Sequence, residues 1–175
     1  WSGKKASAPT LEKKHHTYFL RFSYTEEVSL SKTAVKEQVI CSVDLGINTD
    51  AVCSIMCADG TILGRKFINF SSDKDHLYHV LGGSRRFQRE HSSRQVQSRW
   101  NYAKRQNMEL SRKIAAAITK CAIEYQADVI VFEYLETQGK LSGKKKQKLH
   151  LWRKRDIQKL CEHQAHRCGI HISRV

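Results

Sequence analysis

The order in which apolar patterns follow one another limits the fold of this chain more than any other feature of its sequence. Asp59-Gly60 is a strong hairpin signal between two strand-like segments, and helical spacing of apolar residues appears only after them. A three-stranded antiparallel meander followed by alternating helices and strands predicts a three-layer α/β fold whose later strands are parallel. The expected strands are 38–45, 50–56, 61–70, 129–132 and 170–175, and the expected helices are 100–125 and 149–167.

Two of these elements have especially clear patterns. The first strand is almost continuously apolar, which predicts a central strand covered on both faces. The helix that begins at Trp100 has apolar residues on one face and many lysines and arginines on the other, which indicates a long basic amphipathic helix. Before it, Asp73 could cap a shorter helix that we expect Gly82-Gly83 to interrupt, and 84–99 is expected to be a helical arm or loop.

The start of the chain has a different character. Residues 1–16 are polar and basic without periodicity, which predicts a linker, and 17–24 alternate as a strand with one buried face does. We therefore divide the chain into 1–36, a linker with one strand, and 37–175, the main domain. Because the chain opens on Trp1 and stops directly after an apolar alternation, we expect it to be a fragment.

The charge of the chain indicates its partners. Lysine and arginine total 31 against 17 aspartate and glutamate, a net charge of +14 with histidine neutral. Such a surplus attracts polyanions, so nucleic acid is the expected partner of either an enzyme or a binding protein. No apolar run is long enough for a membrane span and no leader pattern is visible, so we expect no membrane contact and a cytoplasmic location. The 6 cysteines are expected to be reduced.

Two carboxylates occupy unusual positions. Asp44 lies inside the first apolar strand, and Glu133 directly follows the apolar run 129–132. If these strands are neighbours, the two acids converge, and all-oxygen ligands of this kind suit Mg²⁺ or Mn²⁺ in a two-metal site for phosphoryl displacement. The structural alternative is that Asp44 caps the turn into Gly46 and that Glu133 pairs with a nearby lysine.

Basic residues form two zones that could bind nucleic acid. A Gly- and Lys-rich loop follows Glu133 and is placed to contact phosphates, although it could also be a solvated charge run. The residues selected are Arg85, Arg86, Arg94, Arg99, Lys104 and Arg105 in the first zone and Lys144, Lys145, Lys146, Lys148, Arg153, Lys154 and Arg155 in the second.

The spacing of the cysteines and histidines gives only weak support for a zinc site. Cys53 and Cys57 share a strand face without a second pair at zinc spacing, and Cys161, His163, His166 and Cys168 cluster at the last expected helix. Their spacing does not match common zinc sites, so we expect no zinc, with buried structural cysteines and exposed histidines.

The order of elements is ribonuclease H-like, and two motifs resemble a known family. Val43-Asp44-Leu45-Gly46-Ile47-Asn48 resembles the first RuvC motif of the transposon-encoded OrfB/TnpB family of RNA-guided endonucleases, relatives of type V CRISPR effectors. The segment from Val129 to Leu135 resembles the second. The resemblance runs from about Gln38 to Val175 and includes the basic helix and the Leu151-Trp152-Arg153 region.

The resemblance implies a DNA endonuclease with guide RNA and target DNA as partners. It assigns the first two catalytic acids to Asp44 and Glu133, whereas the family's third acid and its zinc ribbon have no counterpart here. It therefore implies an incomplete site with little cleavage by this chain alone. It also implies that 17–24 end an upstream β-rich domain. The sequence cannot indicate the oligomeric state.

Two other functions fit parts of the pattern. A non-catalytic nucleic-acid-binding module on the same fold would need only the basic residues. Asp44-Leu45-Gly46 also resembles the first phosphate loop of actin-like ATPases, but those need a second comparable domain, for which 175 residues leave little room.

Overall fold

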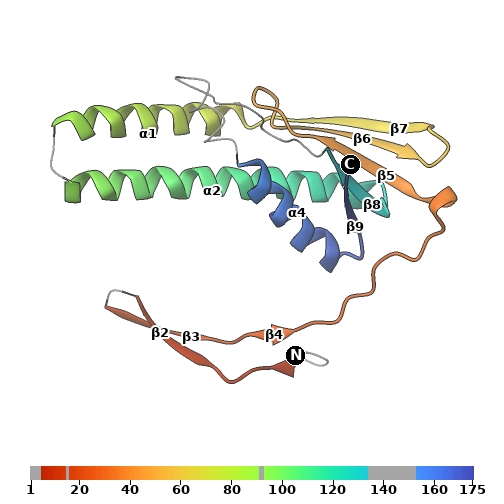
Figure 1. The fold of residues 1–175 in the computed structure, drawn as a ribbon, viewed down its shortest axis with the longest axis horizontal. Coiled ribbons are helices and arrows are strands. Elements are labelled where there is room, and N and C mark those ends of the chain that lie inside the picture. Colours follow the sequence, from red (N-terminus) through yellow and green to blue (C-terminus); the bar gives the residue numbers. More distant parts are fainter. Residues whose placement is uncertain (1–4, 15, 91–92, 134–152) are drawn as a thin grey trace.

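The computed structural model describes residues 5–14, 16–90, 93–133 and 153–175. Figure 1 shows a mixed sheet with helices packed against it and a separate β-ribbon near the start of the chain. The ribbon strands are β1 (Lys5–Ala6), β2 (Thr10–Lys14), β3 (Thr17–Arg21) and β4 (Tyr24–Thr25). After the short helix η1 (Val35–Glu37), the strands of the main sheet are β5 (Val39–Asp44), β6 (Ala51–Cys57), β7 (Ile62–Ile68), β8 (Val129–Phe132) and β9 (His171–Arg174). The helices are α1 (Ser71–Glu90), α2 (Ser93–Glu124) and α4 (Lys154–Arg167).

The five strands of the main sheet lie in the order β7-β6-β5-β8-β9. β6 pairs antiparallel with both β5 and β7, whereas β8 pairs parallel with β5 and with β9. The predicted meander with added parallel strands is confirmed. Each parallel strand follows a helix, because a chain that must return to the same edge of the sheet needs a crossover connection.

The hydrophobic core lies between one face of the sheet and the helices. Cys41 and Val43 of β5 and Ile130 and Phe132 of β8 are all buried, and their register partners place them on one face. Side chains of α2 and α4 close this core; those that are completely buried include Ala115, Ile118, Cys121, Cys161 and Ala165.

The opposite face of the sheet is more open than the sequence indicated. Ile40 and Ser42 of β5 are only half-buried, and Phe67 of β7 is 68% exposed. The expectation that the first strand is covered on both faces is therefore wrong for the described residues, in which the helices that pack on the sheet lie on one side (Figure 1). A run of β-forming residues reports strand preference, and it does not report which faces find a partner.

The helices α1 and α2 form a long antiparallel hairpin (Figure 1). α1 continues without a break through Gly82-Gly83, so the expected interruption is wrong, and most of 84–99 is helical. Leu77, Leu81 and Ser84 are buried on the inner face of α1. This packing compensates for the low helix propensity of glycine, as tertiary contacts commonly do. None of the described helices combines the length and apolar composition that crossing a bilayer requires.

The ribbon before the main sheet also differs from expectation. Residues 10–14 form β2 and pair with β3, although the sequence had predicted a linker there. β3 is exposed along its whole length instead of having one buried face. Its alternation was read correctly as a strand, but within the described chain nothing covers it.

A polar contact holds the connecting segment against the amino-terminal edge of the parallel strands. The carboxylate of Asp128 accepts hydrogen bonds from the hydroxyls of Ser31 (2.5 Å) and Thr33 (2.6 Å) and from the backbone N–H of Val39 (2.9 Å). Burial by itself would raise the pKa of Asp128, but these donors stabilise the charged form, and the pKa lies below its usual value. The ring Nε2 of His171 lies 2.7 Å from the carbonyl oxygen of Ser31.

Candidate catalytic carboxylates and nucleic-acid-binding surface

Asp44 and Glu133 occupy corresponding positions on neighbouring parallel strands. Val43 of β5 is in register with Phe132 of β8. Asp44 is the last residue of β5, and Glu133 directly follows β8. Ser42 pairs with Val131 on the same face two residues earlier, so the acids share the face that the helices leave open. Strand spacing of about 4.8 Å puts the two positions side by side.

Both acids are exposed. Among the described residues, neither makes a hydrogen bond or an ion pair. The alternative in which Asp44 caps its own turn and Glu133 pairs with lysine therefore finds no support in this part of the chain. Two adjacent, unpaired carboxylates present hard oxygen donors, the chemistry that Mg²⁺ and Mn²⁺ prefer. No three histidine, cysteine, aspartate or glutamate side chains gather around a possible metal position in the described residues.

A second aspartate, which the sequence had placed only at a strand end, orders the turn after Asp44. Asp50 is 5% exposed, and its Oδ2 accepts a hydrogen bond from the backbone N–H of Phe70 at 2.6 Å. Its Oδ1 lies 3.3 Å from Nζ of Lys74, and that ammonium also donates to the carbonyl oxygen of Asn48 at 2.5 Å. The turn that follows Asp44 is thereby fixed to the first turn of α1. The sequence signal that could have identified this role is the position of Asp50 directly before an apolar strand.

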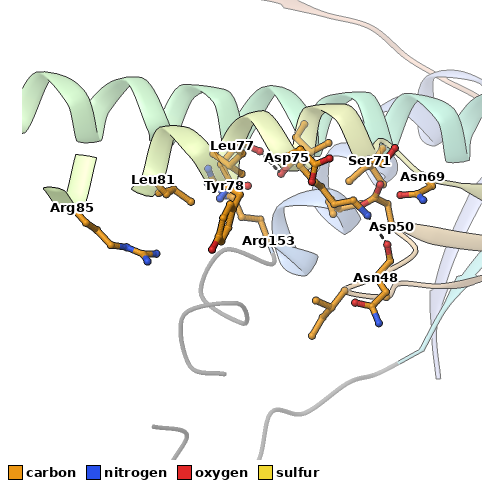
Figure 2. Close-up of a pocket in the computed structure, with 18 residues that line it drawn as sticks. Asn48, Asp50, Asn69, Ser71, Asp75, Leu77, Tyr78, Leu81, Arg85 and Arg153 are labelled. Atoms are coloured by element: carbon orange, nitrogen blue, oxygen red, sulfur yellow. Dashed lines mark hydrogen bonds and ion pairs between the residues drawn. The ribbon is translucent and has the colours of Figure 1, made fainter. Parts of the chain in front are cut away.

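A groove of about 770 Å³ opens beside this turn (Figure 2). Its walls come from the turn after β5, from α1 and α2, and from the start of α4. Leu77, Leu81 and Ile157 form part of an apolar floor, and Tyr78 stands at the rim with 71% of its surface exposed. Gly46 belongs to the lining, whereas the two acids do not, so the groove lies next to the carboxylates without containing them.

The predicted basic residues separate into distinct environments. Arg85 lines the groove of Figure 2, and its buried Nε has no hydrogen-bond partner among the described residues. Arg153, also in the lining, pairs instead with Asp156, its Nε 2.5 Å from Oδ2. Arg86, Arg99, Lys104, Arg105 and Arg155 are exposed, and Lys154 is half-buried. The side chain of Arg94 and residues Lys144, Lys145, Lys146 and Lys148 lie outside the described residues.

The cysteines near α4 lie in different environments. Cys161 is buried and donates to the carbonyl oxygen of Ala115 at 3.5 Å, whereas Cys168 is exposed. Cys53 is buried in the core, away from the half-buried Cys57. The cysteines of the described chain are all free thiols in the structure.

No protein-family model and no curated protein matches the sequence. Solved structures do match it: the cryo-EM structure of a Cas12f1–sgRNA–target DNA complex aligns over 94% of this chain with a TM-score of 0.61 and 16% identity. A CRISPR–Cas12f ternary complex aligns over 95% of it with a TM-score of 0.59 and 15% identity. The chain has the fold of part of Cas12f.

The alignments cover almost all of this chain but less than half of each Cas12f chain. The chain spans 41% and 34% of the two Cas12f chains. Because the alignments cover 94% and 95% of this chain, the match extends beyond the five-stranded sheet. At this level of identity the likeness shows the fold, and the chemistry has to be argued from the residues themselves.

Proposed function

We propose that this chain is the ribonuclease H-like nuclease core of an RNA-guided DNA endonuclease, with Asp44 and Glu133 as two of its metal-binding carboxylates. The observation that carries the proposal is that Asp44 ends β5 and Glu133 directly follows the neighbouring strand β8. Both are exposed, and neither carboxylate has a hydrogen bond or an ion pair among the described residues. One of the Cas12f structures with a similar fold is a complex with sgRNA and target DNA, which supports nucleic acid as the partner.

The role of each carboxylate follows from its position. Asp44 and Glu133 would hold Mg²⁺ or Mn²⁺, and the bound cation would supply charge neutralisation at a phosphodiester and a more acidic water. The salt link of Asp50 to Lys74 would keep the turn after Asp44 in place, because a ligand held on a fixed strand end needs less ordering when it binds. Asp50 is in this sense a positioning residue.

A non-catalytic nucleic-acid-binding module on the same fold is the second candidate. It is favoured by the finding that only two acids come together, with no third metal-ligating group beside them in the described residues. The two candidates agree on nucleic-acid binding and differ on metal binding and cleavage.

Metal binding can be measured whether or not this chain cuts DNA. Titration with Mn²⁺, followed by the loss of the free-ion EPR signal, should show a site in the wild-type chain that weakens at least about tenfold in Asp44→Asn and in Glu133→Gln. Glu109→Gln is the matched control, since Glu109 is exposed and, among the described residues, its carboxylate pairs with Arg112 at 3.2 Å. Equal Mn²⁺ affinity in all four proteins would sink the nuclease proposal.

Cleavage separates the two candidates. If the two acids suffice for cleavage, incubation with a fluorescent single-stranded DNA and Mg²⁺ or Mn²⁺ gives products that disappear in both carboxylate variants and persist in Glu109→Gln. A site without a third acid should give little or no product. Mn²⁺ binding without cleavage would indicate an incomplete catalytic site. DNA binding without Mn²⁺ binding and without cleavage would favour the non-catalytic binding module.

A further inference from the structure

A second groove lies on the α1–α2 hairpin, apart from both the carboxylates and the groove of Figure 2. It has a volume of about 570 Å³ and runs between the two helices. Its charged side chains are Arg99 and Arg105, accompanied by His76 and His79, and no carboxylate of the described residues lines it. The groove is therefore complementary to an anion.

One position in this groove is occupied by a residue that the chain's own packing does not require. Gly83 lines the groove in the interior of α1, where glycine is less favourable than any other residue except proline. Glycine is commonly required in a helix where another part of the protein approaches closely. In the described chain, a β-carbon built at Gly83 would meet no atom within 4 Å. The close approach that glycine permits is thus open to a ligand.

One of the arginines beside Gly83, Arg99, is restricted before any ligand binds. The guanidinium carbon of Arg99 lies 4.0 Å from the centre of the Phe87 ring, a cation–π distance that restricts the side chain. Neither Arg99 nor Arg105 forms an ion pair with a described carboxylate. Tyr102, which is 40% exposed, presents its ring at the same groove, with its hydroxyl 3.4 Å from Nε2 of His76. Cations next to an exposed aromatic ring suit a nucleic-acid strand.

We propose that the α1–α2 groove binds the sugar–phosphate backbone of a DNA strand. The strand lies against the bare helix backbone at Gly83, and Arg99 and Arg105 contact its phosphates. The choice of DNA rests on the proposed function, whereas the groove itself is independent of the two carboxylates.

The neighbouring glycine provides a matched control. Gly82 is exposed, does not line the groove, and would also accept a β-carbon without contact in the described chain. Gly82→Ala and Gly83→Ala should therefore both raise the melting temperature, because alanine favours the helix. Only Gly83→Ala should weaken DNA binding, by about tenfold in Kd. A gain in stability combined with a loss of affinity is a result that a merely structural glycine cannot give.

Binding is measured by fluorescence anisotropy of a fluorescein-labelled dT 20-mer with the 175-residue chain, in EDTA and at several KCl concentrations. The slope of log K against log salt is negative. The double variant Arg99→Gln/Arg105→Gln should reduce its magnitude by about 1.4, since each phosphate contact to a single strand contributes about 0.7. Arg112→Gln/Lys120→Gln removes the same charge from exposed α2 positions paired with Glu109 and Glu124, and should change the slope much less.

Two results would overturn the proposal. One is equal DNA affinity in Gly82→Ala and Gly83→Ala, or equal slopes in the two double variants. The other is an effect confined to a matching rU 20-mer, which would assign the groove to RNA. Because EDTA removes divalent cations, failure of metal binding at Asp44 and Glu133 leaves this measurement unaffected, so the two proposals can fail separately.

Discussion

Val43 and Phe132 lie opposite each other in the parallel ladder between β5 and β8, and both are buried on the helix-covered face of the sheet. Because side chains alternate along a strand, the residue after each of them projects from the other face. The pairing that packs two apolar side chains in the core thus sets Asp44 and Glu133 side by side at the surface. Core packing and the candidate metal site depend on the same register.

Removing the buried side chain of Phe132 should destabilise the whole sheet. Phe132 is completely buried, so Phe132→Ala should lower the free energy of unfolding by about 3–5 kcal/mol. Phe67→Ala, at a position that is 68% exposed, should change it by less than about 0.5 kcal/mol. Urea titration followed by circular dichroism measures both. Similar midpoints for the two variants would contradict the assigned burial.

The contact between Asp128 and the connecting segment should respond to pH. Asp128→Asn weakens three hydrogen bonds to the carboxylate and should lower the unfolding free energy by about 1–3 kcal/mol at pH 7. Since the pKa of Asp128 lies below its ordinary value of 3.8, the charged form is favoured by folding. Its contribution is complete above pH 3.8 and is lost as the pH falls through the lower folded-state pKa.

Stability curves of wild-type and Asp128→Asn protein between pH 2 and 7 check this sign. The difference between the two should be constant near neutrality and should shrink in acid. A difference that grows as the pH falls would contradict the hydrogen-bond assignment. Ser31→Ala should reproduce part of the loss, because it removes one of the donors.

Gly64 should be coupled to Tyr125. A β-carbon at Gly64 would lie 2.6 Å from the Tyr125 hydroxyl oxygen, so the tyrosine ring crosses β7 only because the strand has no side chain there. Gly64→Ala should cost about 1–3 kcal/mol in the wild-type background. In a Tyr125→Ala background it should cost less than about 0.5 kcal/mol. Additive effects in this double-mutant cycle, measured by thermal unfolding, would show that the two residues do not touch.

The thiols should differ sharply in reactivity. Burial raises the pKa of Cys161 to about 12 and that of Cys121 to about 11, which keeps both protonated at pH 8. Cys168 is exposed and should react fastest with DTNB. Cys168→Ser should abolish the fast phase, and the thiols of Cys161 and Cys121 should appear only on unfolding. A fast phase that survives this substitution would contradict the assigned exposure.

The sequence alone predicted the order of the elements along the chain and the direction of the strands in the main sheet, whereas the adjacency of β5 and β8 came from the structure. The Asp59-Gly60 turn and the alternating patterns required a meander, and the helical segments required parallel returns for β8 and β9, because a crossover cannot be made by a tight turn. Local propensity and the lengths of the connections depend on residues that are close together in the sequence, so they can be predicted from it. For the same reason Asp44 and Glu133 could be selected as strand-borne acids before their positions in space were known.

Only the tertiary structure decided which faces these elements present. It left one face of β5 half-open, kept α1 helical through Gly82-Gly83, and placed Arg85 and Arg99 in different grooves. Each of these outcomes depends on what packs against a residue from a distant part of the chain. Whether a residue is buried depends on the segment that packs against it as well as on the residue itself, and a local sequence pattern does not identify that segment.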